Sequence, residues 1–135
     1  MKSLFICVIS FIFFAQGTIA QESQKLQLVS KKIPRVLYGT SSFYANKFEG
    51  RQTANGEIFS QKKLTAACNV LPLGMWIRVT NLHNGRSVIV KVNDRLYYKM
   101  KRVTDLSKAA ARQIGHTDGL IRVKVEPLGM KKPSS

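Results

Sequence analysis

Apolar residues occupy every second position of two neighbouring segments, residues 75–80 and 88–93, with mostly polar residues between them, and this pattern predicts two half-buried β-strands. Asn84 and Gly85 lie between the segments, and an Asn-Gly pair favours the tight turn of a β-hairpin. Residues 121–126 alternate in the same way and predict a third strand. The chain is therefore expected to be mainly β.

One short helix is predicted as well. The hydroxyl of Ser107 can accept a hydrogen bond at a helix start, residues 108–114 can form the helix, and Gly115 can end it. Weaker strand patterns lie at residues 36–38 and 43–45. Several short strands with one helix fit a closed barrel, although periodicity alone does not give the topology of that barrel.

The first 20 residues predict a secretory signal peptide. Lys2 precedes an apolar run over residues 4–15, and Thr18-Ile19-Ala20 supplies a small-residue cleavage site. The run is shorter than the roughly 20 apolar residues that are needed to span a bilayer. We expect cleavage near Ala20 and secretion across the inner membrane, into the periplasm or to the cell exterior.

The remaining chain has the length of one domain. The composition predicts a signal peptide over residues 1–20, a flexible linker over 21–35, a single folded domain over 36–127 and a basic tail over 128–135. We expect this domain to be a monomer.

The chain carries a formal net charge of +15, which favours polyanionic partners such as wall polymers or anionic membrane surfaces. It contains no nucleic-acid recognition motif, so a nucleic-acid partner is not expected. Loss of the signal peptide would leave Cys68 as the only thiol, which excludes an intramolecular disulfide and a cysteine-based zinc site. We expect no metal and no other cofactor.

Asp94 ends the second strand of the predicted hairpin. If the alternation holds to that end, Asp94 faces the same side as Val88, Val90 and Val92, at the margin of an apolar face. Partial desolvation there would favour the protonated carboxylic acid, which is the form that a general acid needs. An Asp that bonds backbone amides in the turn after the strand is the common alternative.

Glu57 is the second candidate acid, because Asn55-Gly56 before it suits a tight loop that delivers a side chain toward a groove. An ordinary carboxylate on a surface loop is the alternative. The other acids of the chain, Asp105 among them, are expected in loops, in the linker or on an outward strand face.

Four blocks of the sequence together resemble the RlpA-like family, secreted double-psi β-barrel proteins whose characterised members cleave bacterial peptidoglycan as lytic transglycosylases. The blocks are GRQTANGE (50–57), LTAACNVLPLG (64–74), VTNLHNGRSVIVKVNDR (79–95) and DLSKAAARQIG (105–115). The resemblance implies a six-stranded double-psi β-barrel with one short helix. It also implies Asp94 as catalytic acid, with Glu57 beside it in the groove.

The implied reaction cleaves the bond between N-acetylmuramic acid and N-acetylglucosamine and leaves a 1,6-anhydro end. The resemblance and the residue chemistry also suggest substrate-binding residues. Thr53 and Asn55 would shape the groove, Arg51 would bind carboxylates, and Tyr97 and Tyr98 would stack on sugar rings. Packing against the barrel is the more common fate of loop tyrosines.

Cys68 departs from the family, whose characterised members have an active-site His at this position. A thiol cannot replace an imidazole as a proton carrier. Either the acid works without that His, or the chain is a non-catalytic, expansin-like module that binds glycan. A buried, inert thiol is the expected state of Cys68.

Overall fold

The computed structural model describes residues 19–25 and 33–134. The chain divides into two units, Met1–Ile33 and Pro34–Ser135. In the first unit, residues 19–25 form a short helix. Most of the predicted signal peptide and much of the predicted linker lie outside the described residues. Within the described residues, no helix is long and apolar enough to cross a membrane.

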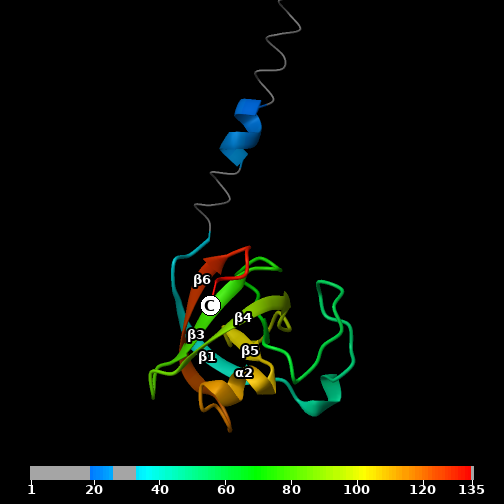
Figure 1. Cartoon of the computed structure of the whole chain (residues 1–135), viewed down its shortest axis with the longest axis vertical. Helices are drawn as coiled ribbons and strands as arrows, with labels where there is room; N and C mark the ends of the chain where they lie inside the picture. Colours follow the sequence, from blue (N-terminus) through cyan, green and yellow to red (C-terminus); the bar gives the residue numbers. More distant parts are fainter. Residues whose placement is uncertain (1–18, 26–32, 135) are drawn as a thin grey trace, which may run out of the picture. The chain divides into compact units, whose positions relative to one another are not determined.

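Six strands of the second unit close into a barrel (Figure 1), in the order β1-β5-β2-β4-β3-β6. β1 pairs with β5, and β2 with β4, in parallel, whereas the other four pairings are antiparallel. Strands far apart in the sequence therefore become neighbours. The strands are β1 (Leu37–Phe43), β2 (Thr65–Ala67), β3 (Trp76–Asn81), β4 (Ser87–Asp94), β5 (Thr104–Leu106) and β6 (Ile121–Gly129).

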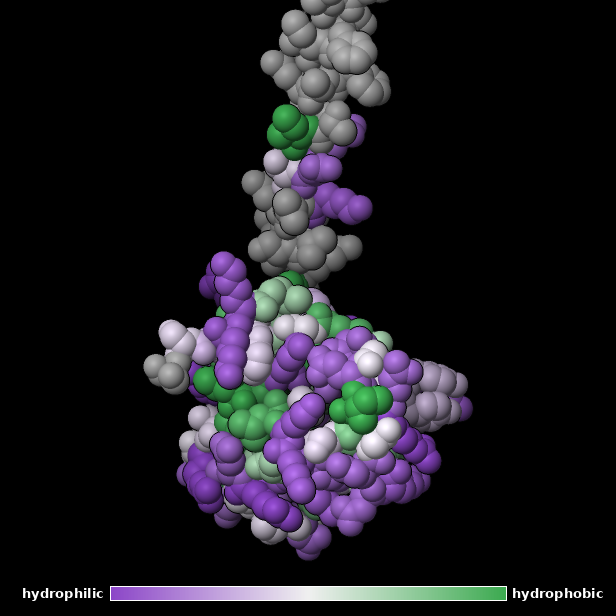
Figure 2. All heavy atoms as spheres, turned by 45° about the vertical axis from the view of Figure 1, so that its right-hand side comes forward, coloured by the Kyte–Doolittle hydropathy of each residue, from purple (hydrophilic) through white to green (hydrophobic). Residues whose placement is uncertain are grey.

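Inward-facing residues of β3 and β4 form much of the core. Ile77 lies opposite Val90, and Val79 opposite Val88, and all four side chains are buried. The predicted alternation is thus confirmed along β3 and along β4 as far as Val92. Outward positions are mostly polar, and Figure 2 shows hydrophilic side chains around a smaller group of hydrophobic ones on one face.

The predicted helix is present as α2 (Lys108–Gln113), the one α-helix that the described residues of the barrel unit form, beside one turn of 3-10 helix, η1 (Asn46–Phe48). The Ser107 hydroxyl accepts a hydrogen bond from the Ala110 amide (3.3 Å). Gly115 follows the helix with φ 69°, a conformation that glycine adopts without steric cost.

Two local expectations were wrong. The weak patterns at residues 36–38 and 43–45 were placed imprecisely, because the strand, β1, runs from Leu37 to Phe43 and includes neither residue 36 nor residues 44–45. The hairpin connection is longer than two residues and covers residues 82–86. The Asn84 side-chain amide donates a hydrogen bond to the Ile114 carbonyl (3.0 Å), and this contact holds the longer connection against the end of α2.

We predict a large difference between two Ile→Ala variants on paired strands. Ile77 is fully buried, so Ile77→Ala should lower the free energy of unfolding by about 2–5 kcal/mol. Ile89 lies on the outward side of β4 and is only half-buried, so Ile89→Ala should cost less than about 1.5 kcal/mol. Urea unfolding measures both values, and equal losses would contradict the assignment of the two faces.

Candidate functional site

Asp94 is placed by an irregularity at the end of β4. Ala66 lies opposite Val92, but Ala67 lies opposite Asp94, so Asn93 is the extra residue of a β-bulge. Val92 and Asn93 are both buried, and Asp94 is half-buried. The expected strict alternation therefore stops before Asp94, and the bulge determines where its carboxylate lies.

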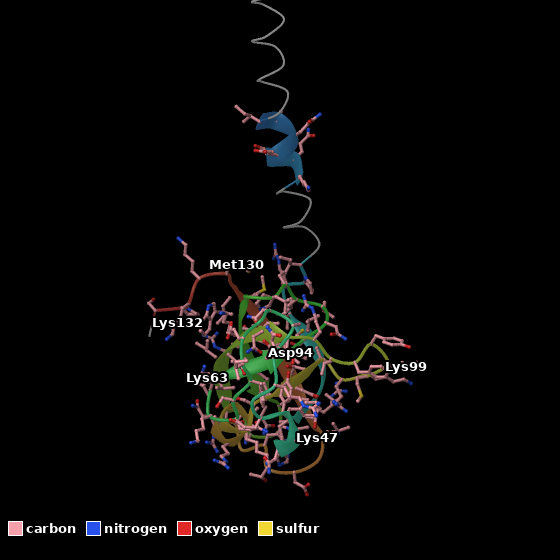
Figure 3. The ribbon with its side chains drawn as sticks, turned by 90° about the vertical axis from the view of Figure 1, so that its right-hand side faces the viewer. Lys47, Lys63, Asp94, Lys99, Met130 and Lys132 are labelled. Atoms are coloured by element: carbon pink, nitrogen blue, oxygen red, sulfur yellow. The ribbon has the colours of Figure 1, made fainter. Side chains whose placement is uncertain are left out.

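The carboxylate of Asp94 accepts three hydrogen bonds. Its Oδ2 accepts one from the Tyr44 hydroxyl (2.6 Å). Its Oδ1 accepts two from backbone amides, those of Ala54 (3.0 Å) and Arg95 (2.9 Å). Donors from three separate segments of the chain therefore fix its orientation. Figure 3 shows Asp94 against the barrel, whereas Lys99 lies at the outer end of a projecting loop.

Asp94 lines a pocket of about 410 Å³. One side is aromatic, another is formed by residues of the segment after β4, and charged groups of both signs complete the lining. The lining residues are Phe43, Tyr44, Ala45, Lys47, Phe48, Ala67, Asp94, Arg95, Leu96, Tyr97, Met100, Arg102 and Asp105. A pocket with apolar walls and a few polar groups is typical of a ligand site.

Tyr44 was not identified from the sequence, although it contacts Asp94 directly. Its ring stacks on Phe59, with 4.2 Å between the ring centroids, and meets Phe48 edge to face. Burial and the hydrogen bond to Asp94 raise the pKa of Tyr44 well above its usual value. Tyr44 is thus a neutral phenol that donates to the carboxylate. The contact joins residues 50 positions apart, so no local pattern could reveal it.

A second carboxylate, Asp105, lines the same pocket. It was not among the predicted site residues. It lies in β5, opposite Ala67, which also lies opposite Asp94 in the sheet. Arg102 donates two hydrogen bonds to Asp105, from Nε (2.8 Å) and from Nη2 (3.0 Å). This pairing raises the pKa of Arg102, so the pocket holds a fixed guanidinium as well as two acids.

The loop that carries Thr53 and Asn55 is held together by its own side chains. The Thr53 hydroxyl donates to Asn55 Oδ1 (2.6 Å), and the Asn55 side-chain amide donates to Glu57 Oε1 (2.6 Å). The backbone amide of Asn55 donates to the Asn93 carbonyl at the bulge (3.2 Å). These contacts place the Ala54 amide on Asp94. The pocket lining includes neither Thr53 nor Asn55.

Glu57 is ion-paired and does not line the pocket. Its Oε1 lies 2.8 Å from the Lys91 ammonium. The hydrogen bonds from Lys91 and Asn55 lower the pKa of Glu57, with burial acting in the opposite direction. Glu57 is therefore held as a carboxylate, which suits an anchor of the loop better than a proton donor.

Cys68 is fully buried and adjoins Asp94 through the backbone. Its amide donates to the Asp94 carbonyl (3.1 Å), and its own carbonyl accepts from the Arg95 guanidinium. Arg95 also donates to the Leu71 carbonyl (2.6 Å), so it braces this segment. A buried thiol is not available for a disulfide with another chain, in line with the expected inert state.

The remaining predicted binding residues surround the pocket. Tyr97 lines it and is 57% exposed, whereas Tyr98, 76% exposed, does not line it, although the two ring centroids are 4.8 Å apart. The Arg51 guanidinium lies over the Phe48 ring, 5.4 Å from its centroid. Both tyrosines are thus available to a ligand, and Arg51 adjoins a wall of the pocket.

A second, smaller pocket of about 250 Å³ adjoins α2. Its lining includes Lys108, Arg112 and the buried His116, and burial lowers the pKa of His116, so that this imidazole is neutral. In the part of the chain that the structure describes, no cluster of three or more His, Cys, Asp or Glu could hold a metal ion.

Comparison with known proteins yields a family and several relatives. The family described as lytic transglycolase matches residues 37–125. The endolytic peptidoglycan transglycosylase RlpA of Pseudomonas aeruginosa (strain UCBPP-PA14) is 53% identical over 91 residues, which is 67% of this chain and 27% of the relative. RlpA of Haemophilus influenzae (strain ATCC 51907 / DSM 11121 / KW20 / Rd) is 46% identical over 95 residues, 70% of this chain and 33% of the relative. The chain thus spans about a third or less of these relatives.

Two solved structures share the fold. Streptomyces papain inhibitor superimposes with a TM-score of 0.57 at 23% identity, over 70% of this chain and 94% of that one. A point mutant of Clavibacter michiganensis expansin in complex with cellohexaose superimposes with a TM-score of 0.55 at 18% identity, over 74% of this chain and 52% of that one. At these identities the likeness concerns the barrel alone.

The Glu57–Lys91 pair predicts a pH-dependent stability difference. The pKa of Glu57 is lower in the folded chain than in the unfolded chain, so its ionised form stabilises the fold. This stabilisation is fully present above the pKa of the unfolded chain, and it is lost as the pH falls through the pKa of the folded chain. Both side chains are about one-third exposed (36% and 34%), so solvent screens the pair. Lys91→Met should therefore cost more stability at about pH 7 than at about pH 2, by a few tenths of a kcal/mol and at most about 0.5 kcal/mol.

Urea unfolding of wild type and variant at both pH values measures this difference. The matched control is Lys62→Met, which replaces an exposed lysine and should show no such change with pH. A loss in Lys91→Met that is the same at both pH values would contradict the ion pair as its cause.

Proposed function

This chain belongs to the RlpA-like family of double-psi β-barrel lytic transglycosylases, and we propose that it cleaves the glycan strands of bacterial peptidoglycan as a lytic transglycosylase. The observation that carries the proposal is the carboxylate of Asp94, fixed by three donors at a pocket with aromatic walls. The family supplies the reaction class, and the pocket supplies a carboxyl group that a bound glycan could reach.

In the proposed reaction Asp94 acts first as acid and then as base. Its proton passes to the oxygen between N-acetylmuramic acid and N-acetylglucosamine, and the bond from that oxygen to the anomeric carbon breaks. The 6-hydroxyl of the muramic residue bonds to its own anomeric carbon and gives its proton to Asp94. No water is consumed, because holding the sugar with its hydroxyl in place replaces a second reactant.

Glu57 has a supporting role in this proposal. Its ionised carboxylate accepts hydrogen bonds from Lys91 and Asn55 and so holds the loop that presents the Ala54 amide to Asp94. Thr53 stabilises the same loop from within. The loop therefore shapes the site through the backbone, and Glu57 itself need not exchange a proton with substrate.

Sugar contacts are proposed for the residues around the pocket. Tyr97 offers an exposed ring in the lining, and Tyr98 extends the aromatic surface beyond it. Stacking of sugar rings on exposed tyrosines suits their apolar faces and polar hydroxyls. Arg51, beside Phe48, would bind a carboxylate of the substrate at the rim.

A non-catalytic glycan-binding module is the second candidate, and Cys68 is the observation that favours it. This buried thiol stands where the family has an active-site His, and it cannot carry protons as an imidazole does. The barrel also resembles that of an expansin crystallised with cellohexaose. Such a module would bind wall glycan through the same pocket without cutting it.

We place the protein at the cell wall after secretion, as a monomer without cofactors. The names of its relatives support a peptidoglycan substrate, and the net charge of +15 would add attraction to anionic wall or membrane surfaces.

Mass spectrometry of the products from purified peptidoglycan and from isolated glycan strands tests the proposed function. We expect anhydromuramic ends from the wild-type chain and a fall of about 100- to 10,000-fold in their rate of formation for Asp94→Asn, because the amide cannot supply the proton. The matched control is Asp118→Asn, which alters an exposed acid outside the pocket lining and should leave the rate unchanged.

The products separate the candidate functions. New reducing ends would indicate hydrolysis by water and contradict the transglycosylase. No product, together with pelleting of the protein with insoluble wall material, would establish the glycan-binding module in its place.

A further inference from the structure

The acceptor positions on the Asp94 carboxylate are unequally occupied. A carboxylate has about two lone-pair positions on each oxygen. Oδ1 accepts two backbone amides, those of Ala54 and Arg95, and both of its positions are filled. Oδ2 accepts only the Tyr44 hydroxyl among the described residues, so one position remains on Oδ2. That position is the one available for the proton that the reaction transfers.

Tyr44 is held firmly enough to fix that position. Its side chain is 8% exposed and stacks on Phe59 at 4.2 Å. Its backbone amide donates to the Leu106 carbonyl (2.9 Å), and its carbonyl accepts from the Gln61 side chain (2.8 Å). Both Tyr44 and Asp94 line the pocket, so the contact between them lies at its surface.

The phenol cannot itself replace the acid. Burial, followed by the hydrogen bond to Asp94, raises the pKa of Tyr44 far above the physiological range. The hydroxyl therefore keeps its proton while Asp94 loses one and regains it. A hydrogen bond from a neutral donor is stronger to a carboxylate than to a carboxylic acid. The contact thus strengthens as the proton leaves Asp94, and an interaction of this kind accelerates a reaction.

We propose that Tyr44 is a positioning residue for the proposed transglycosylase reaction. Its hydroxyl holds Oδ2 of Asp94 in place, and Oδ2 exchanges the proton with the glycan through its one remaining acceptor position. Tyr44 stabilises the carboxylate that exists between the two transfers. In the first transfer the proton moves from Oδ2 to the glycosidic oxygen. In the second, the proton of the muramic 6-hydroxyl returns to Oδ2. The proposal rests on the proposed function.

Tyr44→Phe tests it, because the ring and its stacking on Phe59 remain and only the hydroxyl is lost. We expect kcat to fall about 100-fold, the loss typical of one donor to a developing anion, with KM unchanged within about twofold. Weaker support of the carboxylate should also move the high-pH limb of the kcat profile upward. The matched control is Tyr38→Phe, an exposed tyrosine of β1 (64%), which should change neither quantity.

A second measurement separates this role from the proposed function. The ¹³C chemical shift of the Asp94 side chain requires no turnover, and it should change in Tyr44→Phe but not in Tyr38→Phe, because only the first variant removes a donor to Oδ2. Absence of products from the wild-type chain would overturn the proposed function. An Asp94 ¹³C signal that is the same in wild type and Tyr44→Phe, or a fall in kcat without a change in the pH profile, would overturn the role of Tyr44.

Discussion

The β-bulge at Asn93 is the constraint on which the rest of the site depends. An extra residue in β4 shifts the register against β2, so that Asp94 comes to lie opposite Ala67. The bulge also leaves the Asn93 carbonyl free to accept the Asn55 amide, which brings the 50s loop against β4. One irregularity thus sets both the place of the carboxylate and the contact that supplies one of its donors.

Closure of the barrel makes this arrangement rigid. The parallel pairings β1·β5 and β2·β4 bring together strands that the chain separates by long connections, and Tyr44 follows β1 directly. Its hydroxyl then meets Asp94, while Asp105 of β5 lies on the far side of Ala67. A carboxylate on a closed barrel loses little freedom when substrate binds, and this is the preorganisation that catalysis by a single acid requires.

Local patterns in the sequence predicted the parts of the fold that have local causes. Alternation identified β3, β4 and β6, and Ser107 with Gly115 bounded α2. β2 and β5 have three residues each, too few for a readable period, and they exist because the barrel pairs them. The same limit applied to the site. Asp94 and Tyr97 were identified by motif and loop chemistry, whereas Tyr44 and Asp105 reach the pocket only through tertiary contacts.

The central claim is that the pocket around Asp94 binds the glycan. Chemical-shift mapping by NMR tests it most directly, with a glycan tetrasaccharide that carries no peptide stems added to the Asp94→Asn protein. We predict that the perturbed signals cluster around Tyr44, position 94 and Tyr97, in the lining of the 410 Å³ pocket. Perturbations centred on His116 and α2, at the smaller pocket, with none at Tyr44 and position 94, would contradict the assignment of the glycan site.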